Sequence, residues 1–167
     1  MSSITPAPKR PRSKLDRQVD AVMDASRVMV AVVAQSVAEA EVSVTLPGLR
    51  VLVMVHHSDR PLKLGTVAEG LGVHPSNATR TCSKLVDAGL LDRRDDPADR
   101  RSLALTLTPK GQRFVDSVLE RRRQTFERML TKMSATDRDR LTDTLREFAK
   151  AAGETPEEHA AAFGWLR

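Results

Sequence analysis

The longest run of helical spacing lies near the start of the chain. From Leu15 to about Glu41 there is no Pro or Gly, and apolar residues recur every three or four positions, which predicts one long helix. Its central part, "VMVAVVAQSVA", is apolar on more than one face, which is not typical of a solvated surface helix. We therefore expect this helix to be buried on two sides, by a core and by a partner chain.

Three shorter helices are expected next. Pro47 stands at the start of the apolar segment "GLRVLVMVHH", where proline favours a first helical turn. The following segment predicts a third helix from 64 or 66 to 71 and a fourth helix over 75–88, with Gly72 at the tight turn between them. Two helices joined by a short turn that contains glycine form a helix-turn-helix.

A β-hairpin is expected after Gly89, which suits a helix C-cap. The segments "LLDRR" and "SLALTLT" predict two strands, and in the second strand Leu103, Leu105 and Leu107 share one side. The segment "DDPAD" between them has turn chemistry.

Two more helices complete the chain. Thr108 followed by Pro109 predicts an N-cap and a first-turn proline, so a helix should run from 109 to about 133. Ser134 and Asp137 match a capping box that opens a last helix, which ends near residue 152.

Composition places the chain among ordinary globular proteins, with 40% apolar and 29% charged residues in 167. A single cysteine excludes an intrachain disulfide and fits a reducing cytosol. The first residues lack the apolar stretch of a secretory signal, and no apolar run approaches the length that spans a bilayer. We expect a cytoplasmic protein without a membrane partner.

The net charge of +5 is concentrated near the start. Lys9, Arg10, Arg12 and Lys14 supply +4 within six positions. This basic, proline-containing arm could contact phosphates or could be a disordered solubilising tail, and the sequence leaves both interpretations open.

The fourth predicted helix has two distinct faces. Ala78, Cys82, Leu85 and Val86 share one face, and the other carries Ser76, Asn77, Thr79, Arg80, Ser83, Lys84 and Asp87. A guanidinium at Arg80 can fork onto guanine and an amide at Asn77 can pair with adenine. Short polar residues with two cations favour DNA reading over a merely solvated face.

The predicted hairpin carries four arginines and four aspartates between residues 92 and 101. We interpret some of these acids as groups that orient arginines. Asp99 is placed to accept a bidentate hydrogen bond that holds an arginine extended toward a narrow minor groove. The alternative is a solvent-exposed hairpin with compensating surface charge.

Three segments resemble the winged helix-turn-helix of the multiple-antibiotic-resistance-regulator (MarR) family: "TVAEGLGVHPSNATRTCSKLVDAGLLDRR", "DPADRR" and "LTLTPKG". The resemblance implies a homodimeric transcription regulator with the fourth helix in the major groove and a wing arginine in the minor groove. It makes Arg101 the wing arginine and Asp99 its support. The DNA-binding residues expected on this basis, together with Lys84 from the polar face, are Pro75, Ser76, Asn77, Thr79, Arg80, Lys84, Arg94, Asp99, Arg100 and Arg101.

The expected fold is mainly α, with a small β-hairpin wing in a winged helix-turn-helix lobe and a helical dimerisation region. Residues 1–14 form a disordered basic arm, 15–152 a single MarR-like domain and 153–167 a C-terminal tail. Within the domain, 15–45 and 109–152 are the dimerisation helices and 46–108 the lobe, with its wing at 92–102.

The resemblance also implies a repressor that binds a pseudo-palindromic operator and is released by a small aromatic or anionic effector. We expect its pocket to be lined partly by the first, second and fifth helices, and the effector is unknown. The operator, the regulated genes and the choice between repressor and activator stay open.

Other chemistries receive little support from the residues. Cys82 lies on the inward face, where cysteine is usually an inert small hydrophobe. The four histidines show no ligand spacing, so we expect no metal and no cofactor. No catalytic constellation is found, so we expect no enzyme. The alternative function is a winged-helix module for protein association or nucleoid organisation, without an effector.

Overall fold

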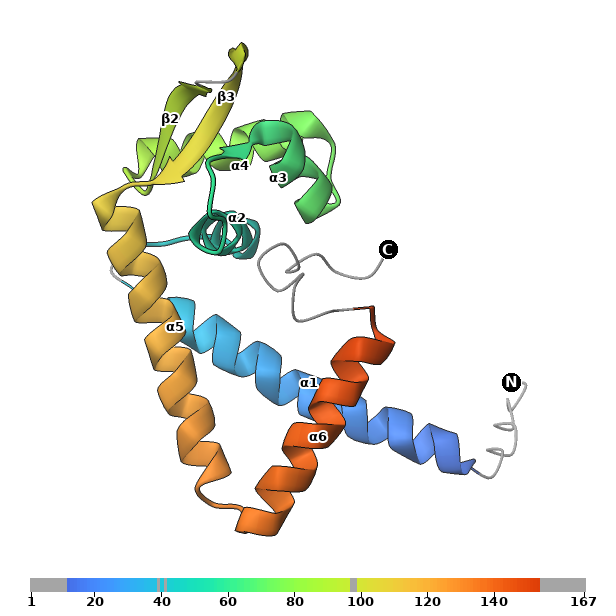
Figure 1. Cartoon of the computed structure of the whole chain (residues 1–167). Helices are drawn as coiled ribbons and strands as arrows, with labels where there is room; N and C mark the ends of the chain where they lie inside the picture. The colour runs from blue at the N-terminus through green and yellow to red at the C-terminus, as the bar shows by residue number, and fades with distance from the viewer. Residues whose placement is uncertain (1–11, 39, 41, 97–98, 154–167) are drawn as a thin grey trace, which may run out of the picture. The chain divides into compact units, whose positions relative to one another are not determined.

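The computed structural model describes residues 12–38, 40, 42–96 and 99–153, apart from the side chains of 95, 96 and 99–103 (Figure 1). The chain divides into two compact units, residues 1–35 and 36–167. Most of the expected basic arm and C-terminal tail lies outside the described residues. The predicted mainly helical fold is confirmed.

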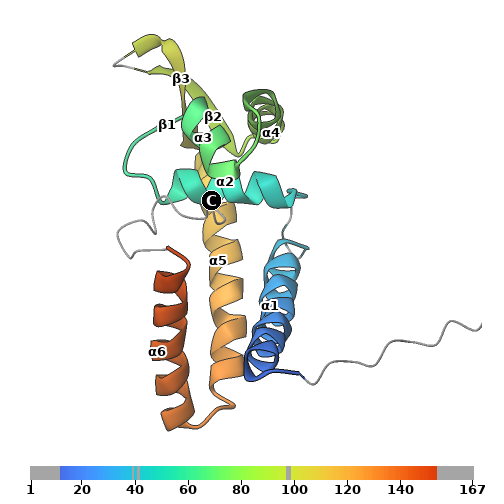
Figure 2. The same cartoon turned by 90° about the vertical axis from the view of Figure 1, so that its right-hand side faces the viewer.

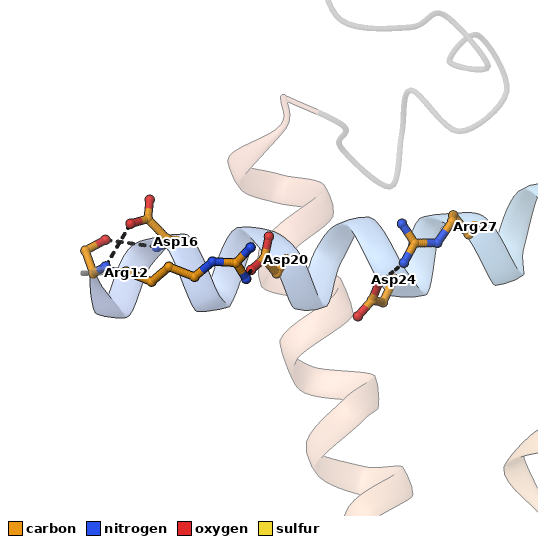
Figure 3. Close-up of polar contacts among 6 residues, drawn as sticks. Arg12, Asp16, Asp20, Asp24 and Arg27 are labelled. Carbon is orange, nitrogen blue, oxygen red and sulfur yellow. Dashed lines mark hydrogen bonds and ion pairs between the residues drawn. The ribbon is translucent and has the colours of Figure 1, made fainter. Parts of the chain in front are cut away.

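The first unit contains most of α1 (Lys14–Ala38), which confirms the predicted long helix and ends three residues earlier than expected. The helix begins at a reciprocal cap (Figure 3). The Ser13 amide donates to Oδ2 of Asp16 at 2.7 Å, and the Asp16 amide donates to Oγ of Ser13 at 3.0 Å. These hydrogen bonds hold the pKa of Asp16 below its ordinary value. Along the same helix Arg12 pairs with Asp20 at 2.5 Å, and Arg27 pairs with Asp24.

The surface of α1 is rich in apolar side chains. Seven of them are exposed in the single chain: Leu15, Val19, Val22, Met23, Val28, Met29 and Val30. By length and composition alone α1 could cross a membrane, which corrects the expectation that no segment approaches that length. One such helix is weak evidence for a membrane, because a helix covered by protein has the same composition.

The second unit is built around α2 (Leu46–His56), whose residues 51–55 are all buried. Thr45 caps α2 by accepting from the Gly48 amide, with Pro47 in the first turn. This helix contacts α3 (Leu64–Leu71), α4 (Pro75–Asp87) and α5 (Pro109–Leu130) (Figure 2). Its apolar run is therefore the centre of the core.

The turn between α3 and α4 has the predicted glycine. Gly72 closes α3 with a φ of 67°, a left-handed conformation that favours glycine. Gly89, after α4, has a φ of 70° for the same reason. The helix-turn-helix expected from the sequence is confirmed.

The sheet has three antiparallel strands, β1 (Leu62–Lys63), β2 (Leu91–Asp96) and β3 (Asp99–Leu107), in the order β1-β3-β2. The hairpin is confirmed, but β1 was not predicted, because two residues carry no alternating pattern. Ala104 and Leu105 are both buried although they are consecutive in β3. Both faces of this end of the strand are therefore covered, since β3 also contacts α2 and α3.

The last two helices begin at the predicted caps. Oγ1 of Thr108 accepts from the Gly111 amide at 2.9 Å at the start of α5. Ser134 opens α6 (Ala135–Ala151), where its Oγ accepts from the Asp137 amide at 3.1 Å and donates to the Asp137 carboxylate at 2.7 Å. α6 buries none of its residues in the single chain and exposes Leu145 and Phe148.

Candidate nucleic-acid interface

The N-terminal end of α4 is fixed by a histidine. Nδ1 of His74 accepts from the Ser76 amide at 3.3 Å and lies 2.9 Å from Oγ of Ser76. Pro75 fills the first helical position, where the missing N–H costs nothing. The sequence did not assign His74 a role, because histidine is not among the preferred N-cap residues. This cap fixes the backbone conformation at the N-terminal, polar end of α4.

The inward face of α4 is confirmed. Ala78 and Cys82 are fully buried and Leu85 is 4% exposed. Burial raises the pKa of the Cys82 thiol, and the nearby positive charge of Arg93 opposes that shift. A protonated, inaccessible thiol is unreactive, so the expectation of an inert Cys82 agrees with its surroundings.

The outward face of α4 presents the predicted polar residues to solvent. The exposed residues are Pro75, Ser76, Asn77, Arg80 and Lys84. Thr79 is half-buried, and its hydroxyl donates to the Pro75 carbonyl at 2.9 Å. Among the described residues, the side chains of Arg80 and Lys84 form no hydrogen bond or ion pair. Two cations one turn apart are therefore available for bases or phosphates.

Arg93 connects β2 to α4, a contact that the sequence did not reveal. Its Nη2 donates to Oγ of Ser83 at 3.1 Å and approaches the Thr79 carbonyl oxygen at 3.5 Å. The side chain is half-buried. Consecutive strand residues point to opposite faces, so Arg93 turns toward the helix and Arg94 away from it. In the sequence, only this alternation could have indicated that Arg93 faces α4.

Arg94 is paired with an acid, as the interpretation of this hairpin expects for some of its arginines. Its Nε donates to Oδ2 of Asp92 at 2.9 Å, and three quarters of the Arg94 side chain is exposed. An exposed pair contributes little to stability. The pair restrains the guanidinium at Nε, while most of the side chain stays open to solvent.

The expected wing arginine, Arg101, and its expected support, Asp99, both lie on β3. Asp99, Arg100 and Arg101 belong to the backbone of β3, and Asp99 pairs in register with Asp96. Their side chains are outside the described residues. The roles assigned to these three residues stay predictions.

The junction between α4 and the hairpin is held by the start of α5. Nζ of Lys110 donates to the Ala88 carbonyl at 2.8 Å, and Oγ1 of Thr108 donates to the Gly89 carbonyl at 2.7 Å. A Cβ added to Gly111 would lie 2.0 Å from the carbonyl oxygen of Leu90. The residues of "LTPKG" therefore have a structural role, because they connect the start of α5 to the end of α4, the helix that precedes the hairpin.

No group of three or more His, Cys, Asp or Glu side chains that could hold a metal ion is found within the described part of the chain. His56 and His57 contact each other edge to face, with ring centroids 4.9 Å apart. Nδ1 of His56 lies 3.0 Å from the side-chain Nε2 of Gln112 and 3.9 Å from the Asp116 carboxylate. These contacts join α2 to α5.

Comparisons with known proteins agree with this arrangement. A family model described as the MarR family matches residues 43–102, which contain α2, α3, α4 and most of the hairpin. The chain is 34% identical over 92 residues to the transcriptional repressor MprA of Escherichia coli (strain K12). These 92 residues cover 55% of this chain and 51% of MprA. The chain thus spans about half the length of this relative.

Two solved structures extend the likeness. The crystal structure of RV1404 from Mycobacterium tuberculosis is 36% identical, with a TM-score of 0.76 over 87% of this chain and 98% of that chain. The PcaV transcriptional regulator from Streptomyces coelicolor, in complex with its natural ligand, is 28% identical, with a TM-score of 0.53 over 77% of this chain and 90% of that chain. With the helix-turn-helix, the hairpin and these relatives in agreement, the chain belongs to the MarR family of transcriptional regulators.

Proposed function

We propose that this protein is a sequence-specific DNA-binding transcriptional regulator that places α4 in the major groove and the hairpin over 92–102 in the minor groove. The observation that carries the proposal is the exposed polar face of α4, with Arg80 and Lys84 unpaired among the described residues. Buried Ala78 and Cys82 hold that face rigidly against the core. The proposal gives the protein no catalytic role.

We infer that the DNA-bound form is a homodimer and that it represses transcription. One chain supplies one α4, whereas a pseudo-palindromic operator needs two helices about one helical turn apart. The exposed apolar side chains of α1 and α6 are suited to burial against a second copy. The relative MprA is named a transcriptional repressor. The same proposal locates the protein in the cytoplasm with its DNA.

We further infer that a small aromatic or anionic effector releases the DNA. The relative PcaV has been solved in complex with its natural ligand, which supports ligand control in a chain of similar fold. An effector can change DNA affinity only if it binds the two states of the protein with different affinities. Occupancy of such an effector site would thereby be coupled to the affinity of the lobe for DNA.

Footprinting of purified protein on the DNA around its own gene tests the proposal. We expect two protected segments with centres about one helical turn apart, and affinity that falls steeply with salt as counterions are released. Uniform weak binding to all duplexes, or no protection at low salt, would reject sequence-specific regulation.

A further inference from the structure

The apolar run of α2 is interrupted by one charged residue. Residues 49 and 51–55 are buried, whereas Arg50 between them is half-buried. Burial lowers the pKa of Arg50 from its ordinary value, because the charged guanidinium is partly withdrawn from water. A charge at such a position opposes folding unless polar groups compensate it. The groups that contact Arg50 should therefore explain why an arginine stands there.

Arg50 donates a hydrogen bond to the end of α3. Its Nη2 lies 2.8 Å from the carbonyl oxygen of Gly70, twenty residues further along the chain. Carbonyls in the last turn of a helix have no partner within the helix and form the negative end of its dipole. The two carbonyls before Gly70 accept from the amides of Val73 and Gly72, at 3.1 and 2.9 Å. Arg50 thus adds a donor from α2 to the two donors that the turn provides.

A second residue of α2 contacts Gly70 as well. A Cβ added to Gly70 would lie 2.3 Å from Cε and 3.1 Å from Sδ of Met54. Met54 is buried and lies four residues after Arg50, so the two side chains share one face of α2. Gly70 is therefore held at two points, at its carbonyl oxygen by the guanidinium and near its Cα by the thioether.

The position of Gly70 bears directly on where α4 begins. Only residues 71–74 separate Gly70 from Pro75, the first residue of α4. Gly72 and Val73 within that segment are themselves hydrogen-bonded back to α3. A short turn that is bonded at both of these residues has little freedom to absorb a displacement. A shift of the end of α3 is therefore transmitted to the polar end of α4.

We propose that Arg50 is a positioning residue for DNA recognition, which together with Met54 holds Gly70 and so fixes the start of α4 against the core. Arg50 acts through α3 and the turn and does not contact the duplex. Hydrogen bonds to base edges weaken steeply when their geometry changes, whereas attraction to phosphates carries no sequence information. The effect on DNA reading rests on the proposed function; the attachment of α3 to α2 does not.

Arg50→Met tests the role, because methionine keeps the apolar stem and removes the donor. Operator binding should weaken about three- to tenfold, which is part of what the loss of a charge-assisted hydrogen bond costs. Binding to random duplex and the salt slope should stay as in the wild type. Val118→Ala, in the buried stripe of α5, controls for lost stability, and Lys132→Met controls for one lost exposed charge. Both controls should keep operator affinity at a temperature where every variant is folded.

Gly70→Ala tests the same attachment from the other helix. The added Cβ must displace Met54, so operator binding should weaken in this variant as well. Met54→Ala leaves the hydrogen bond from Arg50 in place and makes room for that Cβ. The double variant Gly70→Ala/Met54→Ala should therefore regain operator affinity although its Tm stays below that of the wild type. Operator affinity that simply follows Tm across these variants would mark all three residues as structural and overturn the proposal.

Amide hydrogen exchange gives a readout that does not need DNA. The amides of Gly72 and Val73 should exchange faster in Arg50→Met but not in Val118→Ala. Wild-type operator affinity in Arg50→Met would overturn the positioning role, and a salt slope reduced by about one ion would show a direct phosphate contact instead. A wild type that does not distinguish operator from random duplex rejects the proposed function. Exchange then decides the attachment alone: faster exchange in Arg50→Met keeps it, and unchanged exchange rejects it.

Discussion

Arg93 on β2 donates a hydrogen bond to the hydroxyl of Ser83 on α4, with a nitrogen–oxygen distance of 3.1 Å. This hydrogen bond joins the strand that leads into the hairpin to the helix proposed to enter the major groove. Both side chains are half-buried, so the bond is partly shielded from water. If the two elements read neighbouring grooves, the bond sets the angle at which they meet the duplex.

Arg93→Met should therefore weaken operator binding through position rather than charge. Loss of a hydrogen bond to a charged donor costs about 1.5–3 kcal/mol, and we expect a loss of operator affinity near the lower end of that range. The dependence of affinity on salt should not change. Ser83→Ala should have a smaller effect in the same direction, and the double variant should be no worse than Arg93→Met. The measurement is a salt titration of operator affinity.

Arg94→Met is the matched control for this experiment. Arg94 is exposed and is one of the expected DNA-binding residues. We expect it to contact a phosphate, so its removal should reduce the salt slope by about one ion. If Arg93→Met changes the slope as Arg94→Met does, Arg93 contacts DNA directly and the positioning role is wrong.

Arg80→Ala and Lys84→Ala should differ in kind. We expect Arg80→Ala to cost about 1–3 kcal/mol on the operator and to relax selectivity at one base pair, because a guanidinium can read guanine. Lys84→Ala should weaken operator and random DNA alike. Both residues are exposed and without a partner among the described residues, so neither change should move the Tm. Competition binding with single-base operator variants measures the difference; equal loss on all variants for Arg80→Ala would contradict base reading.

Arg101→Ala tests the wing. Operator binding should weaken by about 1–3 kcal/mol, and hydroxyl-radical protection of the minor groove should disappear at the operator flanks. Asp99→Ala should reproduce part of that loss if Asp99 orients Arg101. Equal affinity of Arg101→Ala and the wild type at matched salt would remove Arg101 from the interface.

Gly111→Ala should destabilise the fold. The added Cβ would lie 2.0 Å from the carbonyl oxygen of Leu90, and backbone atoms cannot move aside as a flexible side chain can. We expect the free energy of unfolding to fall by about 1–3 kcal/mol, as in overpacked cores. Gly65→Ala is the control, because no atom lies within 4 Å of its added Cβ. That change should be neutral or should stabilise by about 0.4–1 kcal/mol. Urea denaturation of both variants compares them directly.

Cys82 should make the protein less stable at alkaline pH. Burial raises the pKa of the folded thiol, whereas the unfolded thiol has its ordinary pKa near 9.0. The stabilisation is thus complete below pH 9.0 and is lost as the pH rises through the higher folded value. Cys82→Ala should show a smaller decline in stability above that pH. Denaturation at several pH values measures the two slopes, and identical slopes would show that other groups cause the alkaline loss.

Local structure was readable from the residues because its signals act within about one helical turn. Apolar spacing predicted the six helices, Thr108 and Ser134 predicted two starts, and the glycines at 72 and 89 predicted the turns. The separation of α4 into a buried and a polar face followed from the same periodicity.

Contacts between elements could not be read in this way, because they depend on which side chains packing brings within reach. Strand β1 has only two residues and exists through its pairing with β3. The bond from Arg93 to Ser83 crosses from β2 to α4, and the need for glycine at 111 arises from the carbonyl oxygen of Leu90. Arg50 stands in an apolar run of the sequence, but only the folded chain shows that its guanidinium donates to the carbonyl oxygen of Gly70. Patterns along a chain report the conformation of neighbouring residues, whereas the satisfaction of a polar group depends on every atom that surrounds it in three dimensions.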